Sequence, residues 1–152
     1  MGQISILEFA DRMNEVMPML INGFSRRQNN ELYRGKISLP QFLVLEFLHK
    51  EGESKMTQLA QFMGVTTAAM TGIADRLVRY GYVVRIFDPA DRRTIKAKLT
   101  AKGQELVRRI TQQRRQMVIN IFGKISEAER SNYLSILMRI RDILANSKEA
   151  RA

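Results

Sequence analysis

The 152-residue sequence contains no cysteine and no tryptophan, and His49 is its only histidine. Without cysteine the chain forms no disulfide, offers no thiol nucleophile and has no thiolate metal site or redox switch. A single histidine nearly excludes zinc sites and catalytic triads that need imidazoles. A glycine-rich phosphate loop and an acidic metal motif are missing as well. The sequence therefore predicts a protein that is not an enzyme, with no catalytic residue, no metal and no cofactor.

Long apolar runs are also absent. No stretch approaches the roughly 18 consecutive apolar residues of a membrane span, and the first 30 residues lack the pattern of a secretory signal. The chain is 45% hydrophobic and 26% charged, which is typical of a globular protein. We expect a single domain that stays in the cytoplasm and does not engage a membrane.

Negative charge is scarce in one third of the chain. The formal net charge is +10, and residues 76–124 hold 13 basic but only 3 acidic side chains, while the remainder is close to neutral. A positive field concentrated in this way suits a polyanion such as nucleic acid. The alternative is a solvated helix face that only aids solubility, which so focused an imbalance disfavours.

Apolar spacing and capping residues predict the first four helices. Apolar residues recur at steps of three and four over 6–24, where Pro18 should kink the helix, and the polar segment 25–36 should form a loop. Ser38-Leu39-Pro40-Gln41 predicts a capping box that starts a second helix, which residues 51–54 end. Thr57 is expected to cap a short helix over 58–63. Thr66 or Thr67 should cap a fourth helix that reaches Tyr80.

The second half of the sequence predicts a hairpin followed by two long helices. Residues 82–87 and 94–99 have the pattern of strands, and the Asp-Pro-Ala-Asp-Arg-Arg segment 88–93 between them is rich in turn formers. Thr100 should open a long helix. Ser126 and Glu129 form a second capping box, which should open the last helix. The expected fold class is therefore mainly α with a small β-hairpin.

Ala60, Gly64 and Met70 have the spacing of a helix-turn-helix. Ala60 lets the second helix cross closely, Gly64 permits the positive φ of the turn, and Met70 packs the second helix onto the first. This spacing alone is common, but here a basic hairpin follows directly. Together they predict a winged helix-turn-helix, whose second helix enters the major groove of DNA while the wing reaches the neighbouring minor groove.

The run from Leu39 to Leu106 resembles the DNA-binding core of the multiple antibiotic resistance regulator (MarR) family. The similarity lies in the segments LPQFLVLEFL, TQLAQFMGVTTAAMTGIADRLVRYGYVVR and DPADRRTIKAKLTAKGQEL. It implies a winged helix-turn-helix over 37–100 between an N-terminal dimerisation helix and loop, 1–36, and C-terminal dimerisation helices, 101–152, in one intertwined domain. It also implies a homodimeric, sequence-specific transcriptional regulator of a pseudo-palindromic operator in double-stranded DNA. Such a protein is usually a repressor that a small, often aromatic, anion releases.

The candidate DNA contacts lie at the start of the third helix, on the outer face of the fourth and on the wing. They are Lys55, Thr57, Thr66, Thr67, Ala68, Ala69, Thr71, Gly72, Arg76, Arg92 and Arg93. On the fourth helix only Arg76 combines charge with a long reach, so we expect specificity to depend on DNA shape and on the wing. The plainer interpretation of Arg76 and Arg79 is surface ion pairing, and that of Thr57 is capping.

The resemblance assigns roles within the wing and to a ligand pocket. It points to Arg93 as the minor-groove finger, held by Asp91, with Asp88 also orienting the wing. Ala90 replaces the first arginine of the family's wing, so the choice between Arg92 and Arg93 stays open. By family analogy the pocket candidates are Met13, Met17, Phe24, Phe42 and Phe62, although packing is the simpler role for each.

Two further alternatives concern assembly and specificity. The terminal helices carry more apolar surface than a winged core can cover, which favours a homodimer over a monomer with an intramolecular helical layer. The outer face of the fourth helix is unusually small, which keeps open a non-specific DNA-binding, architectural or protein-interaction module that uses the same basic surface. The sequence does not identify an effector, an operator or the regulated genes.

Overall fold

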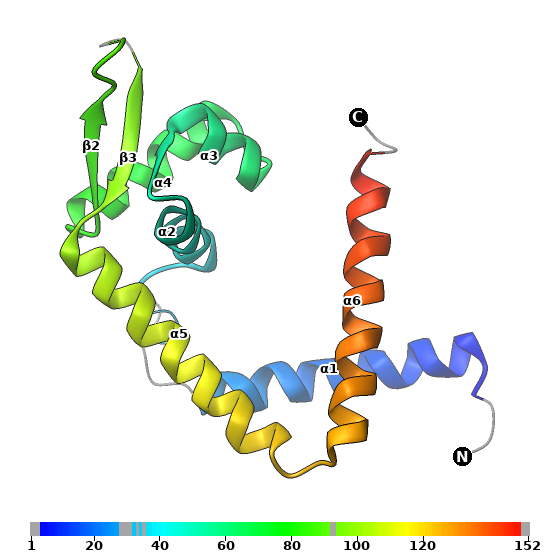
Figure 1. The fold of residues 1–152 in the computed structure, drawn as a ribbon. Coiled ribbons are helices and arrows are strands. Elements are labelled where there is room, and N and C mark those ends of the chain that lie inside the picture. Colours follow the sequence, from blue (N-terminus) through cyan, green and yellow to red (C-terminus); the bar gives the residue numbers. More distant parts are fainter. Residues whose placement is uncertain (1–3, 28–31, 33, 35, 92–93, 150–152) are drawn as a thin grey trace. The chain divides into compact units, whose positions relative to one another are not determined.

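The computed structural model describes residues 4–27, 32, 34, 36–91 and 94–149. The elements within this part of the chain are α1 (Ile6–Arg26), α2 (Leu39–Glu51), β1 (Glu53–Lys55), α3 (Met56–Met63), α4 (Thr67–Arg79), β2 (Val83–Phe87), β3 (Ile95–Leu99), α5 (Ala101–Phe122) and α6 (Glu127–Glu149) (Figure 1). The fold class is the predicted one, mainly helical with a small antiparallel sheet. The chain divides into two compact units, Met1–Gln113 and Arg114–Ala152, so the boundary falls inside α5.

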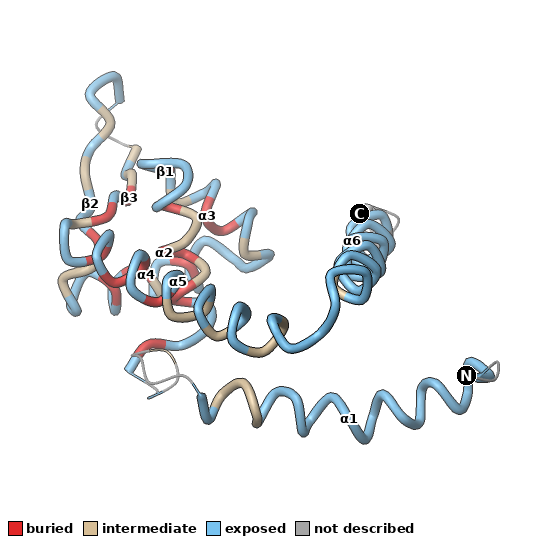
Figure 2. The backbone as a smooth tube through the Cα atoms, turned by 60° about the horizontal axis from the view of Figure 1, so that its bottom comes forward, coloured by how far each residue is buried: buried red, intermediate tan, exposed pale blue. Residues whose placement is uncertain are grey.

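Helix α2 begins with the predicted capping box and lies at the centre of the core. The Ser38 N–H donates to Gln41 Oε1 at 2.8 Å, and the Gln41 N–H donates to Ser38 Oγ at 3.4 Å. The helix then buries Phe42, Leu45 and Leu48. Buried residues gather in α2, α3, α4, β3 and the first half of α5 (Figure 2). These elements therefore form one hydrophobic core.

The structure corrects two expectations between α2 and α3. Residues 53–55, expected only to end α2, form strand β1, in which Ser54 pairs with Ala97 of β3. Helix α3 begins at Met56, and Lys55 rather than Thr57 is its N-cap. The Gln58 side chain accepts hydrogen bonds from the Lys55 N–H at 3.0 Å and from the Ser54 hydroxyl at 3.2 Å. A side chain inside the helix thus defines its start, so a threonine cap is not needed.

Helices α3 and α4 form the predicted helix-turn-helix. Gly64 ends α3 with φ of 64°, in the left-handed region that glycine adopts without strain. Thr66 then caps α4 by accepting a hydrogen bond from the Ala69 N–H at 3.2 Å. Ala60 and Met70 are both buried where the helices cross. The roles predicted for the alanine, glycine and methionine are therefore confirmed.

Strands β2 and β3 form a hairpin whose base is buried and whose far end is exposed. The strand order is β1-β3-β2, with Val83 opposite Leu99 at the base and Phe87 opposite Ile95 at the far end. Val83 and Leu99 belong to the core, whereas Phe87 and Ile95 are exposed. The hairpin thus projects beyond the core as a wing.

The start of α5 is joined closely to the end of α4. The Thr100 hydroxyl donates to the Gly81 carbonyl at 2.7 Å and accepts from the Gly103 N–H at 3.0 Å, while the Thr100 N–H donates to the Tyr82 carbonyl at 3.0 Å. A Cβ at position 103 would overlap the Tyr82 carbonyl oxygen, so only glycine fits there. Three buried residues of α5, Leu106, Val107 and Ile110, then complete the core.

Helix α1 buries none of its residues and is continuous through Pro18. Ser5 caps it by accepting a hydrogen bond from the Glu8 N–H at 3.1 Å. Its apolar row, including Met13, Met17 and Leu20, is exposed. The helix is therefore locally well defined although its apolar face is open.

The unit formed by 114–152 contains the end of α5 and all of α6. The predicted capping box is present, since the Ser126 N–H donates to Glu129 Oε2 at 2.8 Å and the Glu129 N–H donates to Ser126 Oγ at 3.3 Å. The rings of Phe122 and Tyr133 stack with centroids 5.4 Å apart. Every described side chain from Ser131 to Asn146 is exposed.

The described residues form neither a membrane-spanning helix nor a cluster of metal-ligating side chains. No helix among them is both long and apolar enough to cross a bilayer. Nowhere in the same residues do three or more histidine, aspartate or glutamate side chains gather in a way that could hold a metal ion.

Candidate nucleic-acid interface

Helix α4 has one face that the chain covers and one that it leaves open. Met70, Ala74 and Leu77 are buried against the core. The predicted contacts on the other face are all exposed, namely Thr67, Ala68, Ala69, Thr71, Gly72 and Arg76. A Cβ at Gly72 would meet no atom within 4 Å, so packing within the chain does not require glycine there. The described part of the chain therefore leaves the side chains of this outer face unburied.

Some polar groups of this outer face form hydrogen bonds within α4 or its N-cap, and others do not. The Thr66 hydroxyl accepts the capping hydrogen bond, and the Thr71 hydroxyl donates to the Thr67 carbonyl at 2.9 Å. Within the described part of the chain, no ion pair or side-chain hydrogen bond holds Arg76. Surface ion pairing is the plainer interpretation of Arg76, but its neighbour Asp75 pairs with a different residue.

That partner is Arg85 on strand β2, one of the 13 basic residues of the segment 76–124. Arg85 Nη2 lies 2.7 Å from Asp75 Oδ1 and also donates to the Thr71 carbonyl at 3.5 Å. The pair joins α4 to the sheet. It forms only because β2 packs against α4, and no local spacing in the sequence signals such a contact.

A second ionic network holds the far end of the wing, next to its tip. The Asp88 carboxylate accepts from the Ala90 N–H at 2.9 Å and lies 3.1 Å from Lys96 Nζ, which also lies 3.0 Å from Glu53 of β1. The Ala90 N–H and then Lys96 hold the pKa of Asp88 below its ordinary value. Glu53 and then Asp88 raise the pKa of Lys96. Asp88 therefore fixes the far end of the wing and shapes the turn at its tip.

The tip of the wing is closed by backbone hydrogen bonds around Asp91. The Asp91 N–H donates to the Asp88 carbonyl at 3.2 Å, and the Thr94 N–H donates to the Asp91 carbonyl at 2.8 Å. The Asp91 carboxylate accepts from the Thr94 hydroxyl at 3.1 Å. Arg92 and Arg93 lie outside the described residues, so their roles stay predictions.

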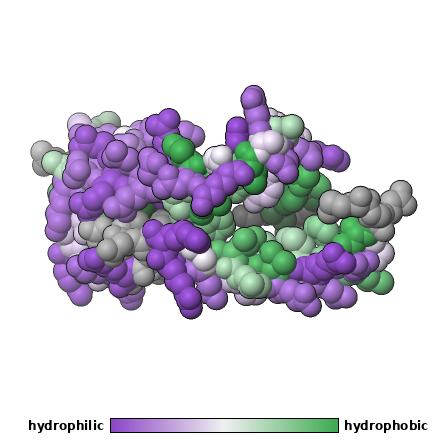
Figure 3. Space-filling model, turned by 90° about the horizontal axis from the view of Figure 1, so that it is seen from below, coloured by the Kyte–Doolittle hydropathy of each residue, from purple (hydrophilic) through white to green (hydrophobic). Residues whose placement is uncertain are grey.

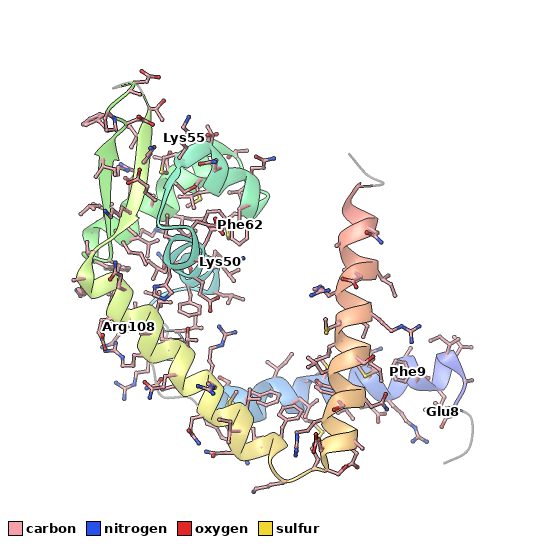
Figure 4. All side chains as sticks on the ribbon, viewed as in Figure 1. Glu8, Phe9, Lys50, Lys55, Phe62 and Arg108 are labelled. Atoms are coloured by element: carbon pink, nitrogen blue, oxygen red, sulfur yellow. The ribbon has the colours of Figure 1, made fainter. Side chains whose placement is uncertain are left out.

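Lys55 and Thr57 lie where α3 begins, and both side chains are exposed. Lys55 is labelled in Figure 4. Because Lys55 is the N-cap and Gln58 closes the first turn, capping does not account for Thr57. The α3 N-terminus presents backbone N–H groups, which favour an anion. These two side chains therefore stay candidates for phosphate contact.

The pocket candidates separate into one core residue and four others. Phe42 is completely buried in the core, where packing is its simpler role, and its part in a pocket stays a prediction. Phe62 is exposed and its ring lies 4.4 Å from that of Phe47, centroid to centroid (Figure 4). Met13 and Met17 are exposed on α1, and Phe24 is half-buried. These four residues are accessible enough to contact a ligand.

Two helices joined by a tight turn, an open outer face on the second helix and a projecting hairpin define a winged helix-turn-helix, a class of DNA-binding fold. Residues 37–95 match the MarR family. This region of the chain, with its winged helix-turn-helix, is therefore of the MarR type.

Individual relatives agree with this assignment. The chain is 24% identical over 115 residues to the HTH-type transcriptional regulator YpoP of Bacillus subtilis. The aligned region covers 76% of this chain and 82% of YpoP. It is 27% identical over 134 residues to the HTH-type transcriptional repressor YetL of the same organism, covering 88% and 75%. FabT of Streptococcus pneumoniae, solved in complex with DNA, has a TM-score of 0.78 and 25% identity over 90% of this chain and 98% of FabT. YpoP and YetL are thus named as a regulator and a repressor of transcription and not as enzymes.

Proposed function

We propose that this protein is a homodimeric repressor that recognises a pseudo-palindromic operator in double-stranded DNA. Helix α4 of each protomer enters the major groove, and the wing reaches the adjacent minor groove. The observation that carries the proposal is the open outer face of α4, on which Arg76 has no ionic partner within the described chain. The solved FabT complex with DNA and the repressor YetL support it.

Each group of candidate contacts has a distinct role in this proposal. Arg76 reaches a base edge or a phosphate, while Ala68 and Ala69 contact thymine methyl groups. Lys55 and Thr57 bind a phosphate at the start of α3. Arg93 or Arg92 enters the minor groove, where a narrow groove attracts arginine. Thr66, Thr67, Thr71 and Gly72 allow a close approach of the α4 backbone.

The proposed dimer rests on the open apolar faces of the terminal helices. On α6 the inner row of Leu134, Leu137, Ile140 and Leu144 is exposed although the helix is capped and regular. Hydrophobic side chains lie open on the surface (Figure 3). Such rows at helical spacing are buried when a second copy supplies matching helices. We therefore propose that 1–36 and 101–152 form the dimerisation region around the DNA-binding region 37–100.

The proposed effector is a small aromatic anion. Met13, Met17, Phe24 and Phe62 are the candidate contacts that are not enclosed by the core. Methionine and phenylalanine side chains offer adaptable apolar contacts to an aromatic ring. Binding would favour a dimer whose two α4 helices no longer match half-sites one helical turn apart, which releases DNA. Titration of benzoate into the protein–operator complex tests this step by measuring the fraction of DNA released.

Selection from a random DNA library tests the proposed function. The purified protein should enrich an inverted repeat with half-sites about one helical turn apart, and it should bind scrambled DNA far more weakly. Tight but unselective binding with a steep salt dependence would overturn sequence-specific regulation. That outcome would favour a non-specific architectural protein, for which the small side chains on the outer face of α4 are the supporting observation.

Arginine variants test the two DNA-reading elements separately. Arg76→Ala should weaken operator binding by about 1–3 kcal/mol, and Arg93→Ala by at least ~1.5 kcal/mol, because each loses a charged contact. Arg139→Ala removes an equal charge from an exposed position on α6 and is the matched control. Binding isotherms that are unchanged for Arg93→Ala would exclude the wing assignment.

A further inference from the structure

We infer that Asp75 and Arg85 are positioning residues, and that their ion pair holds α4 at the angle to the wing that operator recognition requires. This inference rests on the proposed function. The inference goes beyond that function, because neither Asp75 nor Arg85 is among the candidate DNA contacts.

The geometry of the pair suits an orienting role. A single nitrogen of Arg85, Nη2, approaches both Asp75 Oδ1 at 2.7 Å and the Thr71 carbonyl at 3.5 Å. Positions 71 and 75 are one helical turn apart, so the guanidinium contacts α4 over a full turn. Thr71 lies on the outer face of the helix. The contact therefore holds the part of α4 that would lie nearest to DNA.

The pair is too exposed for stability to be its main role. The side chain of Arg85 is 33% exposed and that of Asp75 is 49% exposed, so water screens much of their attraction. Charge-assisted hydrogen bonds of arginine nevertheless have defined directions, which fixes the relative orientation of the elements that they join. Groups that read base edges must be held to within about 0.5 Å, so orientation matters more for recognition than for folding.

The position of Asp75 is otherwise unfavourable for a DNA-binding helix. It places a carboxylate directly before Arg76, on the helix proposed to enter the groove. Coulomb repulsion from phosphates alone predicts that removing this charge strengthens DNA binding. The Arg85 contact explains why an acid occupies this position. The two explanations predict opposite signs for one substitution.

The wing is already held on its other side, so the pair acts at a specific joint. Lys96 of β3 binds Glu53 of β1 and Asp88 beside the tip of the wing, which fixes the hairpin to β1. That network does not reach α4. Arg85, on β2, supplies the ionic contact between the hairpin and α4. The angle between the two DNA-reading elements is therefore set at this contact.

Asp75→Asn is the decisive variant. Its affinity is measured for the operator that the wild-type protein selects and for scrambled DNA. We expect operator affinity to fall about fivefold or more, the lower end of the effect of one mismatched base pair. Affinity for scrambled DNA should stay equal or rise, because a negative charge is lost. Operator binding as tight as that of the wild type, or tighter, would overturn the inference.

Two further variants keep the test independent of folding and of general charge effects. Arg85→Gln should lower the ratio of operator affinity to scrambled-DNA affinity, as Asp75→Asn does. In the double variant this ratio should be no lower than in the single variant with the lower ratio, because both substitutions remove the same contact. Asp142→Asn removes an equal charge from the exposed Arg141–Asp142 pair of α6, and its operator affinity should match the wild type. Additive losses in the double variant would contradict a shared role.

The wild-type measurement separates this inference from the function on which it rests. If the wild-type protein selects no sequence, the proposed function fails and this inference fails with it. If the wild type selects an operator and Asp75→Asn binds it equally well, only the positioning role fails.

Discussion

Helices α4 and α6 both carry an apolar row at helical spacing, but the chain buries only that of α4. Met70 and Leu77 of α4 have no exposed surface, whereas Leu134, Leu137 and Leu144 of α6 are 58%, 42% and 63% exposed. Both helices begin with a hydroxyl cap, from Thr66 and Ser126. Local helix formation is thus equally well specified in the two regions, and the difference lies in what covers them.

This difference indicates that the two regions depend on different sources of stability. The winged core buries its large side chains within one chain, so its stability should be independent of protein concentration. The row on α6 contributes hydrophobic free energy only when another surface removes it from water. In the proposed dimer that surface is a second copy, so the stability of α6 should rise with concentration.

The largest expected effect is on the free energy of unfolding, when the same leucine-to-alanine substitution is made in α4 and in α6. Leu77→Ala should lower the free energy of unfolding by about 2–5 kcal/mol, because it leaves a cavity in a closely packed core. Leu137→Ala removes the same atoms from an exposed position and should cost much less at low concentration. Urea denaturation at two protein concentrations measures both. Equal losses that do not change with concentration would show that α6 is covered within its own chain.

A charge placed on the α6 row sharpens the comparison further. Leu137→Asp should weaken the proposed dimer roughly 100-fold, about 2.7 kcal/mol, because an unpaired carboxylate would be buried at the interface. Ser135→Asp adds the same charge at a neighbouring exposed position outside the inner row and is the control. Sedimentation velocity across a concentration series gives the two dissociation constants. A wild-type chain that stays at 17.5 kDa at micromolar concentration would exclude the dimer.

Local sequence signals predicted most of the fold. The capping boxes at Ser38 and Ser126, the left-handed Gly64 and the ends of α4 all follow from interactions within a few residues. Strand β1 was missed because three residues show no clear alternation, and its partner β3 lies far along the chain. The start of α3 was misplaced because a glutamine side chain took the role expected of Thr57.

The candidate interface was predictable where exposure followed from helical periodicity. The inner positions of α4 could be assigned to packing, which left its outer face by elimination. The Asp75–Arg85 contact was not predictable, because it depends on the packing of β2 against α4. The sequence could not decide between packing and a pocket for Phe42, because a phenylalanine in a core and one in a pocket wall have the same local sequence pattern.

The two capping boxes allow a smaller and more exact comparison. Ser38→Ala should destabilise the winged core by about 1 kcal/mol at any protein concentration, since α2 is integral to that core. Ser126→Ala removes the equivalent hydroxyl from α6, and its effect should grow as the proposed dimer forms. Thermal unfolding at low and high concentration distinguishes the two. A concentration dependence for Ser38→Ala would contradict the independence of the core.

The smallest expected effect on stability comes from the chemical difference between these two capping boxes. Glu129 can ionise, and Gln41 cannot. The hydroxyl and N–H of Ser126 hold the pKa of Glu129 below its ordinary value of 4.5. A carboxyl group with a lowered pKa in the folded state stabilises that state above its ordinary pKa, and this stabilisation is lost as pH falls through the lowered value. Glu129→Gln should therefore make the start of α6 behave like that of α2.

Thermal unfolding of the wild type and Glu129→Gln from pH 7 to pH 3 measures this difference. The wild type should be the more stable at pH 7, because the charged carboxylate also interacts favourably with the N-terminus of α6. The advantage should disappear at the acid end of the range, while Asp88, which also titrates there, contributes equally to both proteins. An advantage that persisted after protonation would mean that Glu129 acts by packing, and the charge of the α6 cap would then have no part in its stability.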